Sequence, residues 1–328
     1  MSRQEHTTDP ILYNDWHIIA RSSELPESYI RPSRLLGEDL IAWRFGGEAR
    51  VWQDLCAHRG TRLSLGKLRE GTLTCAYHGW TYDSDGQCIK FPSHPEQKPP
   101  PTAHVRTYQT TEKYDSVWAS LGEPIREVPE FEEWDDPSFR KVLCGPYRYA
   151  ASAARAVENF LDVAHFPFVH RGLLGDEAHA EINDYEVETD EAGIEARNVV
   201  VWQPDPDGTG KGKTVNYTYR VQRPFTAYFM KTTDEGRFAI QLNVTPMDES
   251  NCVGWMCLAL DYSPETPDSE LRAYQDKITG QDVPIVESQR PERLPLDLQS
   301  ELHLRSDRIA VAYRKWLSDL GLSYGTLG

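Results

Sequence analysis

The sequence predicts an α+β protein of two domains. Residues 1–125 are expected to form an all-β domain, and residues 126–328 a domain in which helices flank an antiparallel sheet. Three observations support this. The 328 residues are enough for two separate cores. Short β-rich runs fill the first third of the chain. Consecutive strand patterns bracketed by helical patterns fill the remainder, which is typical of an antiparallel α+β domain.

The first domain is predicted from β-rich runs and the turns between them. Gly46-Gly47 separates two of these runs and indicates a hairpin. Pro92, Pro95 and Pro99–Pro101 indicate a loop, because proline cannot donate to a ladder and breaks helices. The expected strands are Trp16–Ala20, Leu40–Phe45, Val51–Leu55, Leu73–Tyr77, Thr81–Tyr82 and Ser116–Leu121.

The second domain is expected to begin near the acidic stretch Glu130–Asp136, which is most simply a solvated loop. Helix-favouring residues predict helices over Ala151–Phe166, Ser269–Ile278 and Ser300–Leu320. Between them the expected strands are Ile182–Glu188, Ile194–Trp202, Val215–Val221, Ala227–Thr232, Phe238–Val244 and Val253–Asp261.

Composition excludes several classes of protein. Hydrophobic residues make up 39% and charged residues 26%, as in ordinary globular proteins. The net charge of −16 argues against a nucleic-acid partner, because phosphate binding needs clustered positive charge. The longest apolar run, Cys252–Leu260, is shorter than the roughly 18 residues of a membrane span. The polar stretch Met1–Pro10 does not resemble a secretory signal, and six irregularly spaced cysteines do not resemble a disulfide framework. We therefore expect a cytoplasmic protein.

Two short segments combine cysteine with histidine. Cys56-Ala57-His58 is followed, after 16 residues, by Cys75-Ala76-Tyr77-His78. Zinc can use the same ligand set. The arrangement instead favours a [2Fe–2S] cluster, because each segment supplies one Cys and one His, so that the two Cys can hold one iron and the two His the other. Nearby glycines permit tight turns, and Trp80 and Tyr82 can shield a cluster from water.

These segments resemble a known motif. Cys56–Gly60 and Cys75–Tyr82 are similar to the Rieske motif of ring-hydroxylating and demethylating oxygenases. The additional cysteine that respiratory Rieske proteins carry in each cluster loop is absent. The length of the chain resembles the vanillate-demethylase and dicamba-monooxygenase type, with further likeness to saxitoxin-tailoring hydroxylases. The resemblance implies a catalytic domain of helix-grip (Bet v 1-like) fold.

A second group of candidate ligands follows the predicted helix. His165 and His170 are five residues apart, and we expect Pro167 to bend the helix so that both rings converge. Asp162 precedes His165 by three residues, which places it on the same face of a helix. Two histidines and one carboxylate on one face of Fe(II) leave positions open for dioxygen and substrate.

The resemblance implies which carboxylate binds this iron. It assigns the role to Asp282, with Asp276 and Glu287 as alternatives, although Gln281 stands where the family commonly has an acid. It assigns Asp162 to an electron path, in which this residue pairs with His78 of a neighbouring subunit.

The resemblance further implies a homotrimer served by a separate NAD(P)H-dependent flavin or ferredoxin reductase, acting on a small molecule with O₂. The expected reaction is hydroxylation or oxidative O- or N-demethylation, which the motifs do not separate. Two other interpretations stay open, a Rieske electron carrier without catalysis of its own and a zinc-stabilised binding module. Conceivable substrate contacts are Trp202, Tyr217, Phe229, Gln241, Asn243, Trp255 and Met256.

Overall fold

A computed structural model describes residues 9–328 of the chain. Most of the polar N-terminal stretch considered above lies outside these residues. The chain divides into two compact units, the first ending at Val128 and the second spanning Pro129–Gly328. From the sequence we expected this division at residues 125/126.

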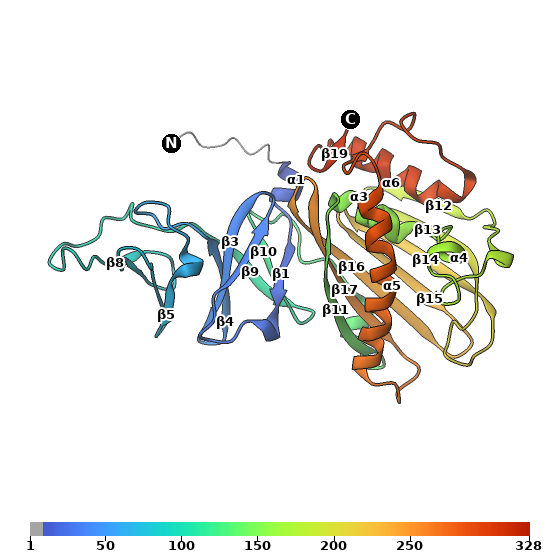
Figure 1. Ribbon diagram of the computed structural model, residues 1–328, viewed down its shortest axis with the longest axis horizontal. Coiled ribbons are helices and arrows are strands. Elements are labelled where there is room, and N and C mark those ends of the chain that lie inside the picture. The colour runs from blue at the N-terminus through green and yellow to red at the C-terminus, as the bar shows by residue number, and fades with distance from the viewer. Residues whose placement is uncertain (1–8) are drawn as a thin grey trace. The chain divides into compact units, whose positions relative to one another are not determined.

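The first unit is built on two sheets. The larger has the strand order β1-β10-β9-β4-β3-β2, and the smaller has the order β5-β6-β7-β8 (Figure 1). Cys56–His58 follows β4 of the larger sheet, and Cys75–His78 lies between β6 and β7 of the smaller one. The buried rings of Trp43 and Trp52 meet edge to face in the core. The strands are β1 (His17–Arg21), β2 (Arg31–Leu35), β3 (Glu38–Phe45), β4 (Glu48–Gln53), β5 (Lys67–Arg69), β6 (Thr72–Thr74), β7 (Thr81–Tyr82), β8 (Cys88–Lys90), β9 (Thr107–Lys113) and β10 (Ser116–Ser120), with short helices α1 (Pro10–Tyr13), η1 (Ser22–Glu24) and η2 (Leu63–Leu65).

The second unit is an antiparallel sheet with the order β11-β17-β16-β15-β14-β13-β12. Along β14 the residues Val215, Tyr217, Tyr219 and Val221 are buried while their neighbours are more exposed, which is the alternation of a sheet with one covered face. The strands are β11 (Arg140–Tyr149), β12 (Glu186–Asp190), β13 (Gly193–Gln203), β14 (Lys213–Arg223), β15 (Thr226–Thr232), β16 (Arg237–Asp248) and β17 (Asn251–Leu260), with the small parallel pair β18 (Leu294–Pro295) and β19 (Thr326–Leu327).

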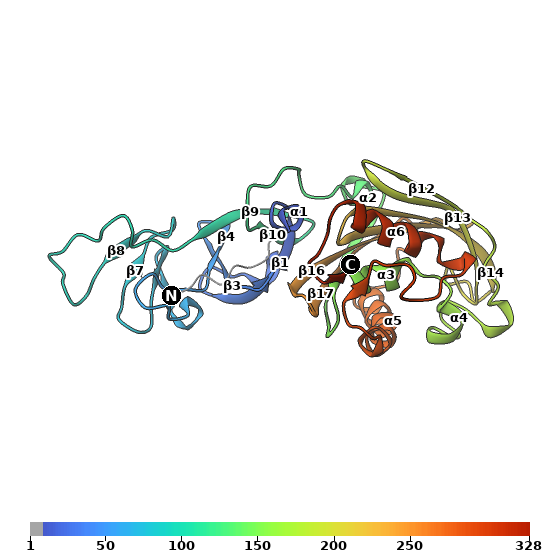
Figure 2. The ribbon, with the colours of Figure 1, turned by 90° about the horizontal axis from the view of Figure 1, so that it is seen from above.

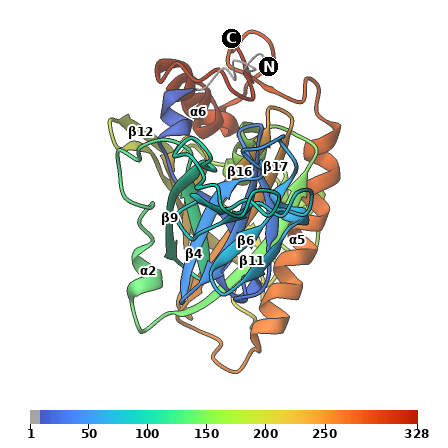
Figure 3. The same cartoon turned by 90° about the vertical axis from the view of Figure 1, so that its left-hand side faces the viewer.

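Helices pack against this sheet. The long helix α5 runs alongside β11 (Figure 3), and α3 contacts the central strands β15, β16 and β17 (Figures 1 and 2). A long helix over a curved antiparallel sheet is the α+β arrangement expected from the sequence. The helices are α2 (Glu132–Asp135), α3 (Ala153–Leu161), α4 (Phe166–Val169), α5 (Asp268–Ser288) and α6 (Arg308–Asp319), with the short turns η3 (Glu177–His179) and η4 (Arg305–Asp307). None of the described helices has both the length and the apolarity to span a lipid bilayer.

Two predicted elements differ from the structure near the candidate ligands. Helix α3 ends at Leu161, five residues before the predicted end, because Asp162 adopts an extended conformation as its C-cap. Pro167 therefore does not bend a helix. It lies in the first turn of the separate helix α4, where its missing N–H costs nothing. Asp162 and His165 consequently share no helix face, and the loop between α3 and α4 brings them together.

Candidate iron centres

The two cysteine–histidine loops have the same backbone turn. In each loop a glycine four residues after the cysteine donates its N–H to the cysteine carbonyl, over 2.9 Å for Gly60 and 3.1 Å for Gly79. Both glycines have positive φ, +69° and +70°, a conformation that side chains disfavour. Each cysteine N–H in turn donates to the carbonyl that follows the glycine. The same backbone turn thus occurs in both cysteine–histidine loops.

These turns sort the four side chains into two pairs. Cys56 and Cys75 are buried in the core of the unit, and the Tyr82 hydroxyl lies 3.1 Å from Cys56 Sγ. The His58 and His78 rings are only half-buried, and their centroids are 4.6 Å apart. The arrangement suits a two-iron cluster in which one iron is held by inner thiolates and the other by outer imidazoles.

Neighbouring groups favour this chemistry at the histidine pair. The His58 ring stacks on Trp80 with centroids 4.3 Å apart, and its Nδ1 has no hydrogen-bond partner among the described residues. Desolvation, and then the positive charges of His78 and Arg59, lower the pKa of His58. A neutral imidazole with a free nitrogen is the form that binds a metal.

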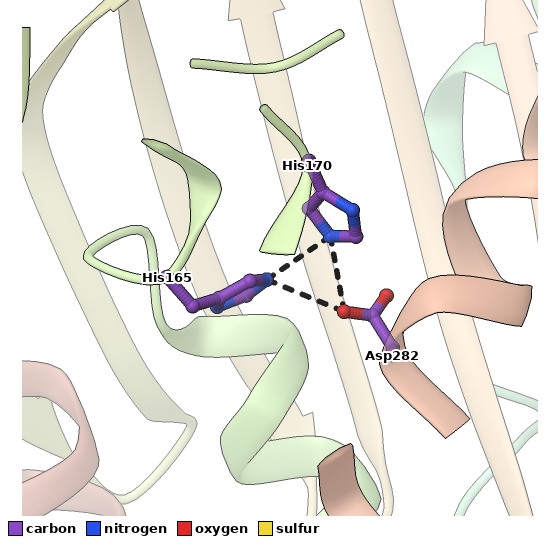
Figure 4. Close-up of side chains that lie close together, drawn as sticks. All are labelled: His165, His170 and Asp282. Atoms are coloured by element: carbon purple, nitrogen blue, oxygen red, sulfur yellow. Dashed lines mark hydrogen bonds and ion pairs between the residues drawn. The ribbon is translucent and has the colours of Figure 1, made fainter. Parts of the chain in front are cut away.

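The second candidate centre joins the α3–α4 loop to α5. His165 Nε2, His170 Nε2 and Asp282 Oδ1 point toward one another, with separations of 3.2 Å between the nitrogens and of 3.4 and 3.0 Å from each nitrogen to the oxygen (Figure 4). Three ligands on one face of an octahedral ion, each about 2.1 Å from it, lie about 3 Å apart. The three atoms therefore fit one face of a metal ion.

The outer nitrogens of both rings face hydrogen-bond acceptors. His165 Nδ1 lies 3.2 Å from Asp162 Oδ2, and His170 Nδ1 lies 2.9 Å from Gln281 Oε1. When each Nδ1 donates its hydrogen outward, both Nε2 atoms turn a lone pair inward. Nothing in the described residues then donates to the buried Asp282 Oδ1. The lone pairs of the two Nε2 atoms and of Asp282 Oδ1 then face one another with no hydrogen between them, and a cation bound among them would remove their repulsion.

Electrostatics point the same way. Burial alone would lower the pKa of His165, but contacts with Asp162 and Asp282 outweigh it and raise the pKa to about 9. Burial would raise the pKa of Asp282, yet its contacts with His165 and His170 hold that pKa below the usual value. The centre thus favours a positive charge between these side chains.

The alternative carboxylates lie elsewhere in the hydrogen-bond network. Asp276 accepts a hydrogen bond from the Tyr147 hydroxyl over 2.7 Å, and Glu287 accepts one from the Ala150 N–H over 2.8 Å. Within the part of the chain that the structure describes, His165, His170 and Asp282 form the group whose ligand atoms all lie within 4.8 Å of one another.

A cavity of about 370 Å³ opens beside this group. Its volume lies in the range of small-molecule sites. Of the contacts considered from the sequence, Tyr217, Phe229 and Met256 line it, whereas Trp202, Gln241, Asn243 and Trp255 do not. Polar lining residues that the sequence analysis missed include Gln203, Tyr219, Lys231 and Gln275.

Comparison with known proteins places this geometry in a family. Residues 15–109 match the model of the Rieske [2Fe-2S] domain, and residues 149–322 match the model of the vanillate O-demethylase oxygenase C-terminal domain. The chain belongs to the Rieske non-haem iron oxygenases. It is a catalytic oxygenase component that uses a Rieske cluster, a mononuclear iron, O₂ and electrons from a separate reductase to hydroxylate or demethylate a small molecule. The interpretations as an electron carrier and as a zinc-stabilised module are thereby set aside.

Several relatives are similar over most of their length. The chain is 31% identical to methylxanthine N1-demethylase NdmA of Pseudomonas putida, covering 93% of this chain and 88% of that protein. It is 31% identical to methylxanthine N3-demethylase NdmB of the same organism, covering 88% and 82%. The structure of Pseudomonas putida CBB5 NdmA with caffeine aligns with a TM-score of 0.83 at 29% identity, over 95% of this chain and 92% of that one. Dicamba monooxygenase bound to dicamba shares the fold, with a TM-score of 0.77 at 23% identity over 94% and 97%.

Proposed function

We propose that this Rieske oxygenase is an N-demethylase, which removes a methyl group as formaldehyde from a nitrogen of a small planar heterocycle. The names of the relatives NdmA and NdmB support the reaction. One observation carries the proposal: the group of His165, His170 and Asp282 lines the same cavity as a set of aromatic side chains. The resemblance to saxitoxin-tailoring hydroxylases noted from the sequence is not tested by these comparisons and stays a prediction.

The walls of the cavity suit a flat ring. Phe160 stacks near Phe229 with centroids 5.3 Å apart, and Tyr217 meets Phe229 edge to face at 5.2 Å. Aromatic walls bind planar heterocycles by stacking and by burial of apolar surface. A planar ring that packs against these side chains would lie in the same cavity as the histidine and carboxylate side chains.

The metal ligands are proposed as follows. His165, His170 and Asp282 hold the mononuclear iron, and Cys56, His58, Cys75 and His78 hold the cluster. When bound, the mononuclear iron activates dioxygen for oxidation of a nearby C–H bond. One oxygen atom is inserted into a C–H bond of the methyl group, and the resulting carbinolamine breaks down to the N–H product and formaldehyde. Two electrons from the reductase and two protons reduce the other oxygen atom to water.

Electrons reach this centre through a proposed subunit contact. Asp162 already holds His165 Nδ1, and in a homotrimer it would also meet His78 of a neighbouring copy. The electrons come from an NAD(P)H-dependent flavin or ferredoxin reductase. A cytoplasmic location is consistent with the six cysteines, none of which forms a disulfide within the described residues.

Turnover tests the proposal. The iron-loaded protein is supplied with an NAD(P)H-dependent reductase, O₂ and a panel of N-methylxanthines and methoxy-aromatics. We expect products that are lighter by one methylene, with one formaldehyde for each N-methyl group lost. Isotope-labelled O₂ and mass spectrometry distinguish this from ring hydroxylation.

A matched variant locates the reaction. His165→Ala is expected to abolish turnover while leaving the visible spectrum of the cluster intact, because His165 lies outside the unit that carries the cluster. Products that are heavier by one oxygen, without formaldehyde, would overturn the proposed demethylation and leave hydroxylation as the activity.

A further inference from the structure

The small sheet β5-β6-β7-β8 has one face turned toward the cysteines of the proposed cluster. In an antiparallel sheet, residues that pair across strands point to the same side, and successive residues of a strand point to opposite sides. Leu73 pairs with Tyr82, and Tyr82 pairs with Cys88. All three are buried in the core that also contains Cys56 and Cys75. The inner face of this sheet therefore covers the cysteine side of the proposed cluster.

The outer face of the sheet carries unpaired lysines. Across the four strands, Lys67 pairs with Thr74, Thr74 with Thr81 and Thr81 with Lys90, and we call these four residues the lysine row. The Thr74 and Thr81 hydroxyls lie 3.1 Å apart, as expected for side chains on one face. Lys67 and Lys90 are exposed, and neither forms an ion pair with a residue that the structure describes.

The lysine row lies at the end of the sheet that carries the second cluster loop. Thr74 directly precedes the proposed ligand Cys75, and the loop of residues 75–80 joins β6 to β7. The carboxylates that this sheet and its turns contribute are at the other end, with Glu70 in the β5–β6 turn and Asp83 and Asp85 in the β7–β8 turn. The chain as a whole has a net charge of −16. A positive surface thus lies next to a cluster loop in an acidic protein.

Both lysines have exposed apolar neighbours. Leu65, two residues before Lys67, is 66% exposed, and Ile89, immediately before Lys90, is 49% exposed. Large apolar side chains that lie exposed beside charged ones are typical of surfaces that bind another protein. Exposure and charge therefore both favour a docking surface here.

The histidine side of the cluster already has a proposed partner. His78 is proposed to pass electrons to Asp162 of a neighbouring copy. A protein that delivers electrons therefore needs a different approach to the cluster. The outer face of the small sheet offers one on the cysteine side, because only the thickness of this sheet separates it from Cys56 and Cys75.

We propose that the outer face of the sheet β5-β6-β7-β8, centred on Lys67 and Lys90, is the surface on which the reductase docks, through an acidic face of its electron-donating domain. Local positive charge steers an acidic partner to this face and fixes its orientation. One electron then passes from the donor, which is oxidised, to the cluster, which is reduced, and no bond forms or breaks. The inference rests on the proposed cluster ligands and electron path, and not on the proposed demethylation.

Reduction of the cluster by an acidic plant-type [2Fe–2S] ferredoxin tests the proposal. The ferredoxin is reduced beforehand and mixed without O₂ with the oxidised, iron-loaded full chain. Electron paramagnetic resonance of rapidly frozen samples follows the reduced Rieske cluster. We expect the second-order rate constant to fall as the salt concentration rises, because salt screens attraction between the lysines and the ferredoxin. The net charges of the two proteins alone would produce the opposite trend.

Charge reversal should slow this step. In the double variant Lys67→Glu with Lys90→Glu, we expect the rate constant at low salt to drop at least about tenfold and to lose its fall with salt. Lys67→Arg with Lys90→Arg keeps both charges and should retain the wild-type rate. The matched control is Lys211→Glu with Lys277→Glu, which makes the same change in net charge at two exposed lysines of the second unit. This control should react at close to the wild-type rate.

Two further measurements exclude indirect effects. The visible spectrum of each variant reports whether the cluster is intact, and light scattering reports its mass. All four lysines are exposed, so their substitution is expected to leave the fold unchanged. A mass of the Lys67 and Lys90 charge-reversal variant that differs from the wild type would show that this face is a contact between copies of the chain, and would overturn the docking surface.

The remaining outcomes are equally decisive. A wild-type rate that rises with salt, or equal slowing by the two charge-reversal variants, overturns the proposed surface. A wild-type cluster that the ferredoxin does not reduce at any salt concentration overturns the acidic partner. Cluster reduction needs no substrate, so the absence of formaldehyde in the turnover experiment would overturn the demethylation and leave this inference standing.

Discussion

The two histidines of the proposed mononuclear centre are oriented by chemically different partners. His165 Nδ1 faces the carboxylate of Asp162, whereas His170 Nδ1 faces the neutral amide of Gln281. A carboxylate partner makes an imidazole a stronger electron donor than an amide partner does. We therefore expect His165 to be the stronger electron donor of the two. Gln281 fixes the orientation of the His170 ring, and His170 is only 1% exposed.

Substitution of Gln281 should weaken iron binding. Gln281→Leu removes the acceptor that fixes the His170 tautomer, and we expect Fe(II) affinity to fall about 10- to 100-fold. Competition with a coloured chelator measures this without turnover. Gln281→Glu restores an acceptor and should bind at least as tightly as the wild type. Unchanged affinity in Gln281→Leu would show that the ring is held by packing alone.

At the scale of elements, helix α3 is fixed by a buried network of charges. Glu158 accepts two hydrogen bonds from the Arg314 guanidinium, over 2.6 and 2.8 Å, and Arg314 also reaches Glu301. Arg155, three residues before Glu158 on α3, also donates a hydrogen bond to Glu301. The loop that carries Asp162 and His165 follows α3 directly. By fixing α3, this network therefore also fixes the position at which that loop starts.

Breaking the network should destabilise the fold. Glu158→Gln leaves the buried Arg314 with one carboxylate fewer, and we expect the free energy of unfolding to fall by about 3 kcal/mol. Urea unfolding followed by circular dichroism measures it. Glu186→Gln, at an exposed position of β12, is the matched control and should change little. Equal effects of the two substitutions would contradict a stabilising role for the network.

Lys231 on β15 predicts a pH dependence of stability. Burial lowers its pKa from 10.5 to about 8, although Asp207 and Asp205 act in the opposite direction. The unfolded chain therefore binds this proton more tightly than the folded chain does. Below pH 8 the buried charged amine therefore lowers the free energy of unfolding. This destabilisation disappears as the pH rises from about 8 to about 10.5.

Relative to Lys231→Met, the wild-type protein should thus gain about 3 kcal/mol of stability across this pH range. Urea unfolding of both proteins at pH 7.5 and at pH 10.5 measures the difference. The same comparison with Lys277→Met, at an exposed lysine of α5, should show no such gain. A constant difference for Lys231→Met would mean that its amine titrates normally.

At the scale of the whole molecule, the proposed electron path needs a second copy of the chain. We expect light scattering to give three times the 37.5 kDa mass of one chain. In Asp162→Asn the remaining amide oxygen can still hold His165, so iron content should persist while multiple turnover is largely lost. Single-turnover product formation distinguishes a blocked electron path from a damaged iron centre. Normal steady-state turnover in Asp162→Asn would exclude this residue from the path.

The local features of both centres were predictable from the sequence. The cluster loops each contain their cysteine, histidine and glycine within a few residues, so the ligand-presenting turn is a property of a short segment. Pro167, between His165 and His170, also led us to predict that the two rings converge, although for the wrong reason. We expected a bent helix, whereas the chain uses a loop followed by the short helix α4, because Asp162 ends α3 as its C-cap.

The amino-acid sequence by itself indicated the two cysteine–histidine segments and the two converging histidines as candidate ligands, since the residues of each group lie within five positions of one another in the chain. Only the tertiary structure decided that Asp282, and neither Asp276 nor Glu287, meets those histidines, because α5 reaches them from more than a hundred residues away.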